Sequence, residues 1–479
     1  MRRVHAERQL ACPVCGGCRA AATVAKGSAR ARVASLVKRL VPGGSAAEQA
    51  EAARALARLC FDKGPNREYV RGCGGVTALV RLLAPGSSSA VHEWAARALL
   101  NLCFDNAKNQ DDIRECGGVA ALVRMLAPSG SVAVRWEAAG PLLCMCKESA
   151  KNRDSVRECG GVAALVGLLA LGGPAAVHER AAGALANLCI NNPQNQDSVR
   201  ECGGVAPLVC LLAPGHSAEV QRGAVGALGT LCTESLGNKD CVRECGGVVA
   251  LVELLAPGGS AGVQRDVVKA LNNLCYGSTE NQDSVRECGG IIALVALLAP
   301  GGSDHVRQRA AVALRSVCFA NTQNQDSVRE CGGIAALVEL LAPGGSAAVQ
   351  EQAATTLQSV CHDNAQNRDS VRECGGIVAL VGLLATACPA AVHRSAAGAI
   401  ACLTRESVPS CEVVEACGGV AALEGVLACA SSAVAHRCVA DVLYDMGRIE
   451  QGVGEASQPK TNGDVLQSSS GGNAGGSGS

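Results

Sequence analysis

Residues 324–361, NQDSVRECGGIAALVELLAPGGSAAVQEQAATTLQSVC, contain the signals that decide the fold. The first part predicts a short helix with an N-cap at Asn324 and a stop at Gly332-Gly333, because asparagine caps helix starts and glycine ends helices. Residues 334–342 are almost entirely apolar and predict a second helix that is buried on most sides. Pro343 breaks that helix, and the alanines and leucines that follow are spaced as in a third helix. The stretch therefore predicts three consecutive helices.

The same pattern recurs along the chain with a period of 43 residues. The tripeptide Cys-Gly-Gly begins at Cys73, Cys116, Cys159, Cys202, Cys245, Cys288, Cys331, Cys374 and Cys417. One three-helix unit cannot bury its apolar surface alone, whereas stacked units bury it against their neighbours. We therefore expect one all-α solenoid domain over residues 33–448, with ten units, of which the first lacks its opening helix.

These units resemble the armadillo repeat. A short helix closed by glycine, an Ala-Leu-Val-x-Leu-Leu helix and a longer helix ending in Ala-Leu-x-Asn-Leu follow one another, and the resemblance covers nearly nine-tenths of the chain. It implies a right-handed superhelix whose third helices line a concave groove. It also implies a scaffold or adaptor that binds an extended segment of a partner protein in that groove.

Composition narrows the function. The 43 basic and 43 acidic side chains give zero formal net charge, which removes the electrostatic basis for binding nucleic acid. Only two Trp, three Tyr and three Phe are present, too few for a stacking platform. No Walker loop, GxSxG or HExxH motif occurs. We expect no enzymatic activity, no cofactor and no metal, and a monomeric protein that binds a protein or peptide partner.

Positions that differ among the repeats are the candidates for partner contacts. In peptide-binding armadillo proteins an Asn near the end of the third helix holds the peptide backbone, and a Trp four residues earlier often flanks it. Three of the ten Asn positions here are Asn, and the Trp positions hold no Trp, which disfavours a nuclear-transport role. The predicted groove residues are Arg54, Arg58, Trp94, Arg97, Asn101, Arg180, Asn187, Asp266, Lys269, Asn273, Arg309, Ser316, Gln352, Ser359, Asp441 and Asp445.

The charges of these residues suggest a groove that is basic at one end and acidic at the other. Arg54, Arg58 and Arg97 come from the first units, whereas Asp441 and Asp445 come from the last. Four of the ten Trp positions hold glycine. Each glycine destabilises a helix by about 1 kcal/mol relative to alanine, so these glycines favour a functional surface. The competing interpretation is that these solvent-facing positions vary by sequence drift and are not selected for binding.

Positions that recur are assigned to packing. The cysteine of Cys-Gly-Gly and the cysteine that ends the third helix both predict small buried residues. The aromatic residues that directly follow the latter, such as Phe104 and Tyr276, are expected to cap the helix end. His92, His178 and His393 share a position near the start of the third helix, where we expect them to be exposed.

Both ends of the chain lie outside the repeat. Residues 1–32 are basic and predict a flexible arm, and residues 449–479 are rich in Gly and Ser and predict a disordered tail. For Cys12, Cys15 and Cys18 several interpretations stay open, namely acylation in a membrane-associated adaptor, half of a zinc site, or part of a targeting segment. No secretory signal is visible, and free thiols in a cytoplasmic protein are expected, with nuclear or membrane-associated locations as alternatives.

Overall fold

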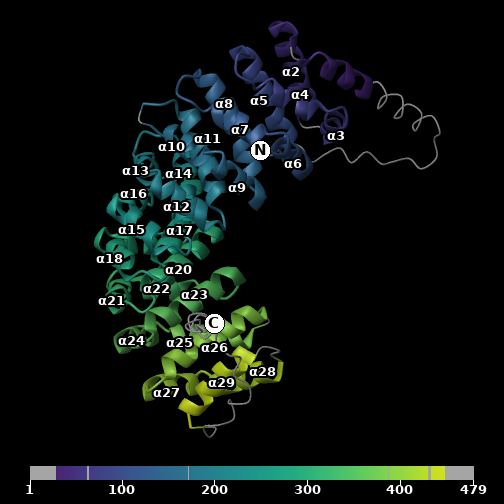
Figure 1. The fold of residues 1–479 in the computed structure, drawn as a ribbon. Coiled ribbons are helices and arrows are strands. Elements are labelled where there is room, and N and C mark those ends of the chain that lie inside the picture. Colours follow the sequence, from purple (N-terminus) through teal and green to yellow (C-terminus); the bar gives the residue numbers. More distant parts are fainter. Residues whose placement is uncertain are drawn as a thin grey trace, which may run out of the picture. The chain divides into compact units, whose positions relative to one another are not determined.

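The structure, a computed structural model, describes residues 29–447 except Pro42, Asp62, Lys63, Leu171, Ala387 and residues 430–432. All regular structure in this part of the chain is helical, as predicted (Figure 1). The chain forms two compact units, unit 1 (residues 1–290) and unit 2 (residues 291–479). Cys12, Cys15, Cys18 and the predicted tail lie outside the described residues.

Each repeat consists of a short first helix, a short second helix and a longer third helix. The first helices are α3 (Gly64–Gly72), α6 (Ala107–Glu115), α9 (Ala150–Glu158), α12 (Pro193–Glu201), α15 (Leu236–Glu244), α18 (Thr279–Glu287), α21 (Thr322–Glu330), α24 (Ala365–Glu373) and α27 (Val408–Ala416). The second helices are α4 (Gly75–Arg81), α7 (Gly118–Arg124), α10 (Gly161–Gly167), α13 (Val205–Cys210), α16 (Gly247–Glu253), α19 (Gly290–Ala296), α22 (Gly333–Glu339), α25 (Gly376–Ala385) and α28 (Gly419–Cys429). Residues 29–38 form a further helix ahead of the first third helix.

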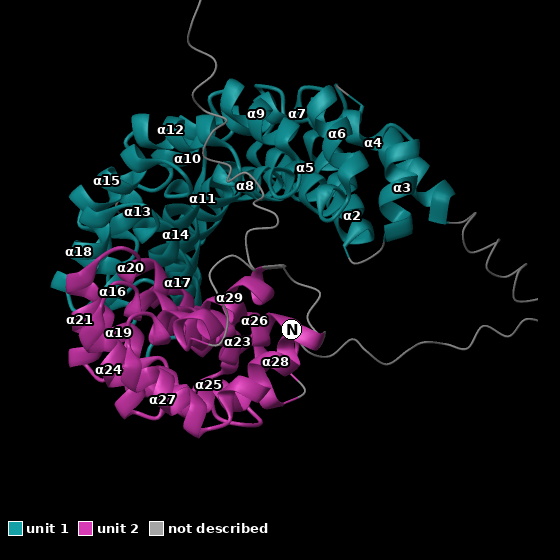
Figure 2. Ribbon diagram, turned by 90° about the horizontal axis from the view of Figure 1, so that it is seen from below, with its two compact units in different colours: residues 1–290 teal, residues 291–479 magenta. Residues whose placement is uncertain are grey.

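The third helices pack against one another in order within each unit. In unit 1 they are α2 (Ala46–Cys60), α5 (Ser89–Cys103), α8 (Val132–Cys146), α11 (Ala175–Cys189), α14 (Ala218–Leu231) and α17 (Ala261–Cys275). In unit 2 they are α20 (Asp304–Cys318), α23 (Ala347–Cys361), α26 (Ala390–Thr404) and α29 (Ala433–Asp445). Figure 2 shows the third helices of unit 1 along the inner side of its arc, with the first helices on the outer side.

The two glycines of each Cys-Gly-Gly serve different purposes. Gly160 has a φ of 76°, which lies in the left-handed region that glycine adopts without strain. Gly161 starts α10 with ordinary helical geometry, but a Cβ atom there would lie 2.4 Å from Val156 Cγ1 and 2.7 Å from the Val156 carbonyl oxygen. The first glycine therefore turns the chain, and the second lets two helices approach closely.

The first helix begins earlier than the sequence predicted. Asn321, not Asn324, is the N-cap of α21, and its side chain accepts a hydrogen bond from the backbone N–H of Asn324. Asn324 is instead fully buried, and its Nδ2 donates to the carbonyl oxygen of Val317 at 2.8 Å. The prediction failed because asparagine occurs at both positions. Asn321 caps its own helix, whereas Asn324 donates a hydrogen bond to the preceding helix.

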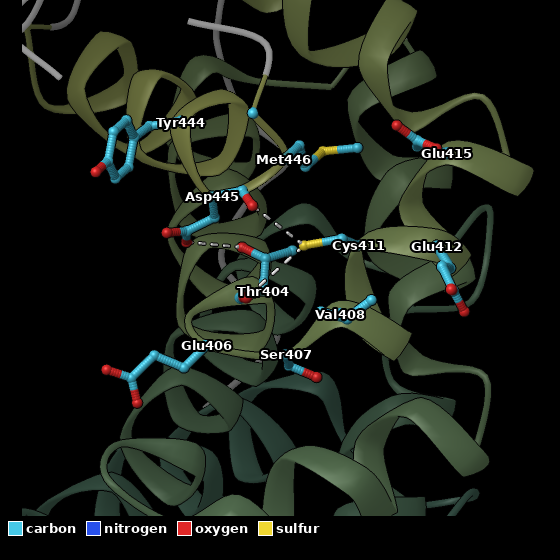
Figure 3. Close-up of a pocket in the computed structure, with 11 residues that line it drawn as sticks. Thr404, Glu406, Ser407, Val408, Cys411, Glu412, Glu415, Tyr444, Asp445 and Met446 are labelled. Carbon is cyan, nitrogen blue, oxygen red and sulfur yellow. Dashed lines mark hydrogen bonds between the residues drawn. The ribbon is translucent and has the colours of Figure 1, made fainter. Parts of the chain in front are cut away.

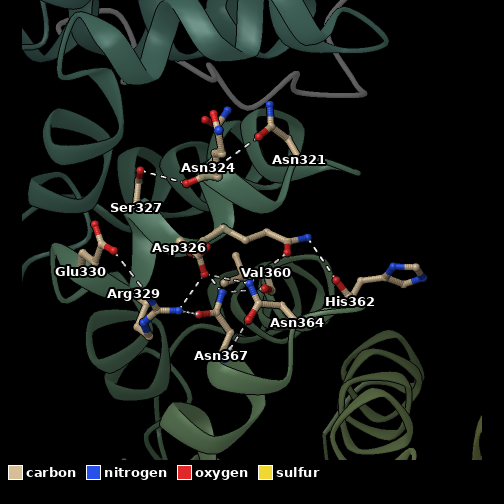
Figure 4. A network of polar contacts seen from close by, with 12 residues as sticks. Asn321, Asn324, Asp326, Ser327, Arg329, Glu330, Val360, His362, Asn364 and Asn367 are labelled. Carbon is tan, nitrogen blue, oxygen red and sulfur yellow. Dashed lines mark hydrogen bonds and ion pairs between the residues drawn. The ribbon is translucent and has the colours of Figure 1, made fainter.

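Buried asparagines also connect neighbouring repeats. Asn367 Nδ2 donates to the carbonyl oxygens of Val360 at 2.9 Å and Gln325 at 3.0 Å, and Asn367 Oδ1 accepts from Arg329 Nη1 at 2.9 Å (Figure 4). Arg329 also pairs with Asp326, three residues earlier on the same helix. The recurring arginine therefore stabilises both its own helix and the contact with the next repeat.

Two predictions about packing are wrong in part. The cysteines that end the third helices are buried, but those of Cys-Gly-Gly are half-buried or, at Cys202 and Cys374, exposed. The aromatic residues after the third helix do not cover the helix end, since Phe104 is 50% exposed and Tyr276 is 72% exposed. Their main chain leaves the helix in an extended conformation, which directs these side chains into solvent.

The histidines near the start of the third helices are not simply exposed. His178 is 2% exposed, and its Nε2 lies 3.1 Å from the carbonyl oxygen of Ala170. His92 and His393 make the same kind of contact to the loop before their helices. Gln350, at the equivalent position of another repeat, donates its amide to Ala342 in the same way. This position therefore fixes the loop between the second and third helices.

We expect His178→Gln to fold normally, because glutamine supplies this contact in other repeats. His178→Ala should lower the free energy of unfolding by about 1–2 kcal/mol, since the Ala170 carbonyl oxygen loses its partner and a cavity forms. Urea denaturation followed by far-UV circular dichroism measures both variants. Equal stability of the alanine variant and the wild type would show that the loop does not depend on this contact.

Candidate binding surface on the third helices

An alternating row of arginine and tryptophan side chains crosses the first four third helices of unit 1. We call it the Arg–Trp ladder, and it consists of Arg54, Trp94, Arg97, Trp136 and Arg180. The Arg97 guanidinium lies between the two tryptophans, with its Cζ atom 5.1 Å from the Trp94 ring centre and 5.6 Å from that of Trp136. Arg54 Cζ lies 5.9 Å from the Trp94 ring, and Arg180 Cζ lies 3.5 Å from the Trp136 ring. Each ring thus contacts two cations, which the electron-rich face of indole favours.

A buried carboxylate holds the ladder in place. The Glu137 side chain is 4% exposed, and its Oε1 accepts two hydrogen bonds from Arg97, one of them from Nε at 2.8 Å. Glu137 Oε2 lies 3.9 Å from Arg180 Nη1. Arg180 Nη1 also donates to the carbonyl oxygen of Trp136 at 2.6 Å. Burial lowers the pKa of the Arg180 guanidinium, and the Glu137 charge opposes that shift. These contacts fix the arginines over the rings.

One of the mid-helix glycines has a structural purpose here. A Cβ atom on Gly140 would lie 2.7 Å from Arg180 Nη1 and 3.0 Å from Leu100 Cδ2. Glycine therefore leaves the space that the Arg180 guanidinium fills. This finding explains Gly140 without a partner. A Cβ atom would lie 3.1 Å from Leu143 Cδ1 on Gly183 and 3.3 Å from Gln358 Oε1 on Gly398, so Gly226 has the most open surroundings of the four glycines.

We expect Gly140→Ala to push Arg180 away from Trp136 and to change the tryptophan fluorescence. Trp94 and Trp136 are the only tryptophans in the sequence, so this emission reports on the ladder alone. The matched control is Gly226→Ala, at the equivalent position of another repeat, where the new Cβ meets Ala186 Cβ at an ordinary 3.7 Å. Similar spectra for the wild type and Gly140→Ala would show that Arg180 does not depend on this space.

The positive charges of the arginines in the first repeats are largely neutralised by acidic side chains of the same chain. Arg54 pairs with Glu51 at 3.1 Å, and Arg97 pairs with Glu137. Arg58 is exposed. At the other end of unit 1, Asp266 Oδ2 accepts a hydrogen bond from Arg222 Nε at 2.8 Å. The surface therefore has a weaker basic character than the sequence suggested, because Glu51 and Glu137, which were not among the predicted groove residues, lie within the same cluster.

The asparagines predicted to hold a peptide backbone already bind their own chain. Asn101 and Asn187 each donate through Nδ2, at 2.8 Å, to a carbonyl oxygen of the preceding third helix, and Asn273 does so at 2.9 Å. Thr230 and Cys402 make the equivalent contact through Oγ1 and Sγ. An amide has further hydrogen-bonding capacity, so a partner contact is compatible with this arrangement.

The predicted residues of unit 2 lie on three of its third helices, α20, α23 and α29. Arg309 and Asp441 are exposed, Gln352 and Ser359 are half-buried, and Ser316 is buried. Asp445 lies beside a cavity of about 940 Å³ at the last repeat, where its Oδ2 accepts from Thr404 Oγ1 at 3.4 Å (Figure 3). Partial burial raises the pKa of the Asp445 carboxyl above its ordinary value.

Sequence reasoning missed Trp136, and it left Glu137 out of the predicted groove residues although Glu137 stands at a compared position. Trp136 lies one position before the residues compared in the sequence, so the register comparison skipped it. The available signal was that both tryptophans of an aromatic-poor chain lie near the starts of consecutive third helices. Which residues contact a neighbouring helix depends on the angle between the two helices. The repeat period alone does not give that angle.

The comparisons with known proteins agree with this architecture. A model of the armadillo/beta-catenin-like repeat matches residues 65–104, 149–190, 192–233, 235–276 and 321–362. The chain is an armadillo-repeat protein. A model of the spinocerebellar ataxia type 10 protein domain matches residues 263–339. No match to a curated protein sequence was found.

Solved structures that are similar to this armadillo-repeat protein include engineered proteins. The crystal structure of one engineered protein superposes with a TM-score of 0.80 at 29% identity, over 87% of this chain and 99% of that one. A designed armadillo-repeat protein matches with a TM-score of 0.47 at 25% identity, over 50% of this chain and 99% of that one. The prediction of an all-α armadillo solenoid is confirmed. Armadillo solenoids generally bind other proteins and typically are not enzymes.

The structure offers no candidate for a membrane-spanning helix among the residues that it describes, because none of those helices combines sufficient length with sufficient apolarity.

Proposed function

We propose that this armadillo-repeat protein is a scaffold whose unit 1 binds an extended segment of a partner protein across the third helices, centred on the Arg–Trp ladder. The observation that carries the proposal is the gathering of both tryptophans and three arginines on consecutive third helices. Tryptophan and arginine are the residues most enriched among those that dominate binding energy at protein interfaces.

The ladder is built as a rigid surface. Each tryptophan is half-buried and contacts two arginines. The buried Glu137 carboxylate pairs with two of these arginines, Arg97 and Arg180. A rigid surface loses little conformational entropy when a partner binds, so more of the contact energy appears as affinity. Asn101 lies on α5, which carries Trp94, and Asn187 lies on α11, which packs against α8. Their amides can pair with a partner's main chain.

The other predicted groove residues of unit 1, Arg58, Asp266, Lys269 and Asn273, belong to the same proposal as secondary contacts. For unit 2 we propose separate contacts on its own third helices, at Arg309, Ser316, Gln352, Ser359, Asp441 and Asp445. A reducing compartment such as the cytoplasm suits the protein, because the described cysteines are free thiols.

A peptide selection tests the proposal. A displayed library of random peptides is selected on the full chain, and the affinities of enriched peptides are measured for the wild type, Trp136→Ala and Tyr276→Ala. We expect Trp136→Ala to weaken binding at least about tenfold, because interface tryptophans often contribute 2 kcal/mol or more. The control removes an aromatic ring that is 72% exposed at the end of α17, outside the ladder, and should change affinity less than about twofold.

Equal binding to the wild type and Trp136→Ala would place the peptide elsewhere on the protein and would contradict the proposal. The circular dichroism spectra of both variants show whether each one is folded before its affinity is compared.

A further inference from the structure

One position of the first helix carries a long hydrogen-bond donor in every repeat that has this helix except the last. Eight repeats have Arg, Gln or Lys there, and the last has Cys411, on α27. The long side chains are Arg67, Gln110, Arg153, Gln196, Lys239, Gln282, Gln325 and Arg368. Cysteine at this position is therefore a departure within the chain's own pattern.

Gln110 shows what the long side chain does. Its Nε2 donates to the carbonyl oxygen of Cys103, at the end of α5, at 2.9 Å, and to that of Cys144, in the last turn of α8, at 3.5 Å. Gln325 makes the same two contacts in unit 2, at 3.4 Å and 3.1 Å, to the ends of α20 and α23. One nitrogen donor thus joins the ends of two consecutive third helices.

In the last repeat a thiol stands in place of this nitrogen. Cys411 Sγ lies 3.8 Å from the carbonyl oxygen of Thr404 and 3.9 Å from that of Asp445, which are the equivalents of Cys103 and Cys144 (Figure 3). A thiol has one weakly donating hydrogen, so it serves only one of these oxygens at a time. The cysteine side chain is also short, and the cavity of about 940 Å³ lies beside it. Both carbonyl oxygens can therefore accept from a donor that enters the cavity.

The cavity favours a donor that carries positive charge. Its acidic lining residues are Glu406, Glu412, Glu415 and Asp445, and no Lys, Arg or His is among the described residues that line it. The negative ends of the α26 and α29 helix dipoles also lie here, and these attract cations. The acids set the charge of the ligand, whereas the two carbonyl oxygens set where its donor must lie.

A guanidinium group meets both requirements, and the first repeats contain the arrangement. Arg67 donates through Nε to the carbonyl oxygen of Cys60 at 3.1 Å and through Nη1 to that of Phe104 at 2.6 Å. Cys60 is the equivalent of Thr404. A guanidinium has five N–H donors in a planar fork, so it can bond to two carbonyl oxygens and still pair with a carboxylate. An ammonium group lacks this fork and fits the two oxygens less well.

We propose that the cavity of the last repeat binds an arginine side chain of a partner protein, whose guanidinium donates to the carbonyl oxygens of Thr404 and Asp445. The partner's arginine takes the place that the chain's own Arg, Gln or Lys fills in the other repeats. This inference rests on the proposed function only in treating Asp445 as a partner contact. It does not depend on the Arg–Trp ladder, which belongs to unit 1.

Methyl NMR of methionine tests the proposal in the wild-type protein. Met446 lines the cavity, whereas Met125 and Met145 are buried in unit 1 and serve as references. The full chain, labelled with ¹³C at the methionine methyl groups, is titrated with the peptide acetyl-Gly-Arg-Gly-amide. A second titration, at the same ionic strength, uses the peptide with citrulline in place of arginine, because citrulline has nearly the same shape and no charge. The Met446 signal is assigned with Met446→Leu.

We expect the arginine peptide to shift the Met446 signal to saturation and to leave the two reference signals unchanged. It should bind at least about fivefold more tightly than the citrulline peptide, because charged donors form the stronger hydrogen bonds and are attracted by the acids. An unchanged Met446 signal, or equal affinities for the two peptides, would overturn the proposal.

Cys411→Gln is the blocking variant, because glutamine occupies this position in four other repeats. Its amide should take the place of the ligand, so the arginine peptide should bind at least about fivefold more weakly than to the wild type. The matched control is Cys374→Gln, at an exposed cysteine of unit 2 that does not line the cavity, and it should change the affinity less than about twofold. Unchanged binding to Cys411→Gln would contradict the proposal.

A last variant separates a partner's arginine from one of the chain itself. Arg448 follows Gly447 directly in the sequence, and Gly447 lines the cavity. We expect Arg448→Ala to bind the arginine peptide as the wild type does. Tighter binding to this variant would show that the chain's own arginine competes for the cavity and would overturn the assignment to a partner. The comparison of the two peptides on the wild type does not depend on the folding of any variant.

Discussion

Replacing Arg97 with alanine is expected to lower the free energy of unfolding of unit 1 by about 2 kcal/mol, because it leaves the buried Glu137 carboxylate without its main partner. Arg180, 3.9 Å away, compensates only part of that charge. The loss is measured by urea denaturation, with tryptophan fluorescence as the signal, since both tryptophans contact Arg97.

A second substitution separates the charge effect from the loss of packing. In Arg97→Ala combined with Glu137→Gln, the buried group is neutral, so at least half of the lost stability should return. The matched control is Arg54→Ala, which also removes an arginine from Trp94 but breaks only the exposed pair with Glu51, at a cost below about 0.5 kcal/mol. Equal losses for Arg97→Ala and Arg54→Ala would mean that Glu137 does not hold the ladder.

Replacing Asn367 with alanine is expected to lower the free energy of unfolding of unit 2 by about 3 kcal/mol. The substitution removes the Nδ2 donor to the carbonyl oxygens of Val360 and Gln325 and the Oδ1 acceptor of Arg329, which keeps its pair with Asp326 (Figure 4). Asn367→Asp should also be less stable than the wild type, although it keeps the side-chain volume and the contact with Arg329, because the oxygen that replaces Nδ2 would face both carbonyl oxygens. Urea denaturation followed by far-UV circular dichroism measures the losses.

The control for this position is Ser327→Ala on α21. Its hydroxyl is exposed and bonds only within its own helix, so its removal should change stability by less than about 0.5 kcal/mol. A loss below about 1 kcal/mol for Asn367→Ala would show that the contact between these repeats does not depend on the buried amide.

The fold could be predicted from the sequence because the repeat supplies many copies of the same local signals. Proline, paired glycines and apolar runs mark helix ends and buried faces in each copy, and errors in one copy are corrected by the others. The functions of single polar residues could not be predicted in this way. Asn324 and His178 both looked like local or solvent-facing residues, yet each binds a carbonyl oxygen of the preceding segment, which only the three-dimensional arrangement reveals.

The candidate site was predicted only in part. Comparison with peptide-binding relatives pointed to the third helices and to Arg54, Trp94, Arg97 and Arg180. It did not reveal that these side chains contact one another through Trp136. Nor did it show that Asn101 and Asn187 already bond to neighbouring helices. Contacts between residues about 40 positions apart depend on how the repeats stack, which no local pattern determines.

Fluorine NMR of the protein labelled with 5-fluorotryptophan shows whether a partner segment lies on the Arg–Trp ladder. The spectrum has one signal each from Trp94 and Trp136, assigned with Trp94→Phe and Trp136→Phe. When a selected peptide is added until binding is saturated, as judged by the anisotropy of a dye on the peptide, we predict that both signals shift. Two unchanged signals at saturation would mean that the bound peptide does not lie on the ladder.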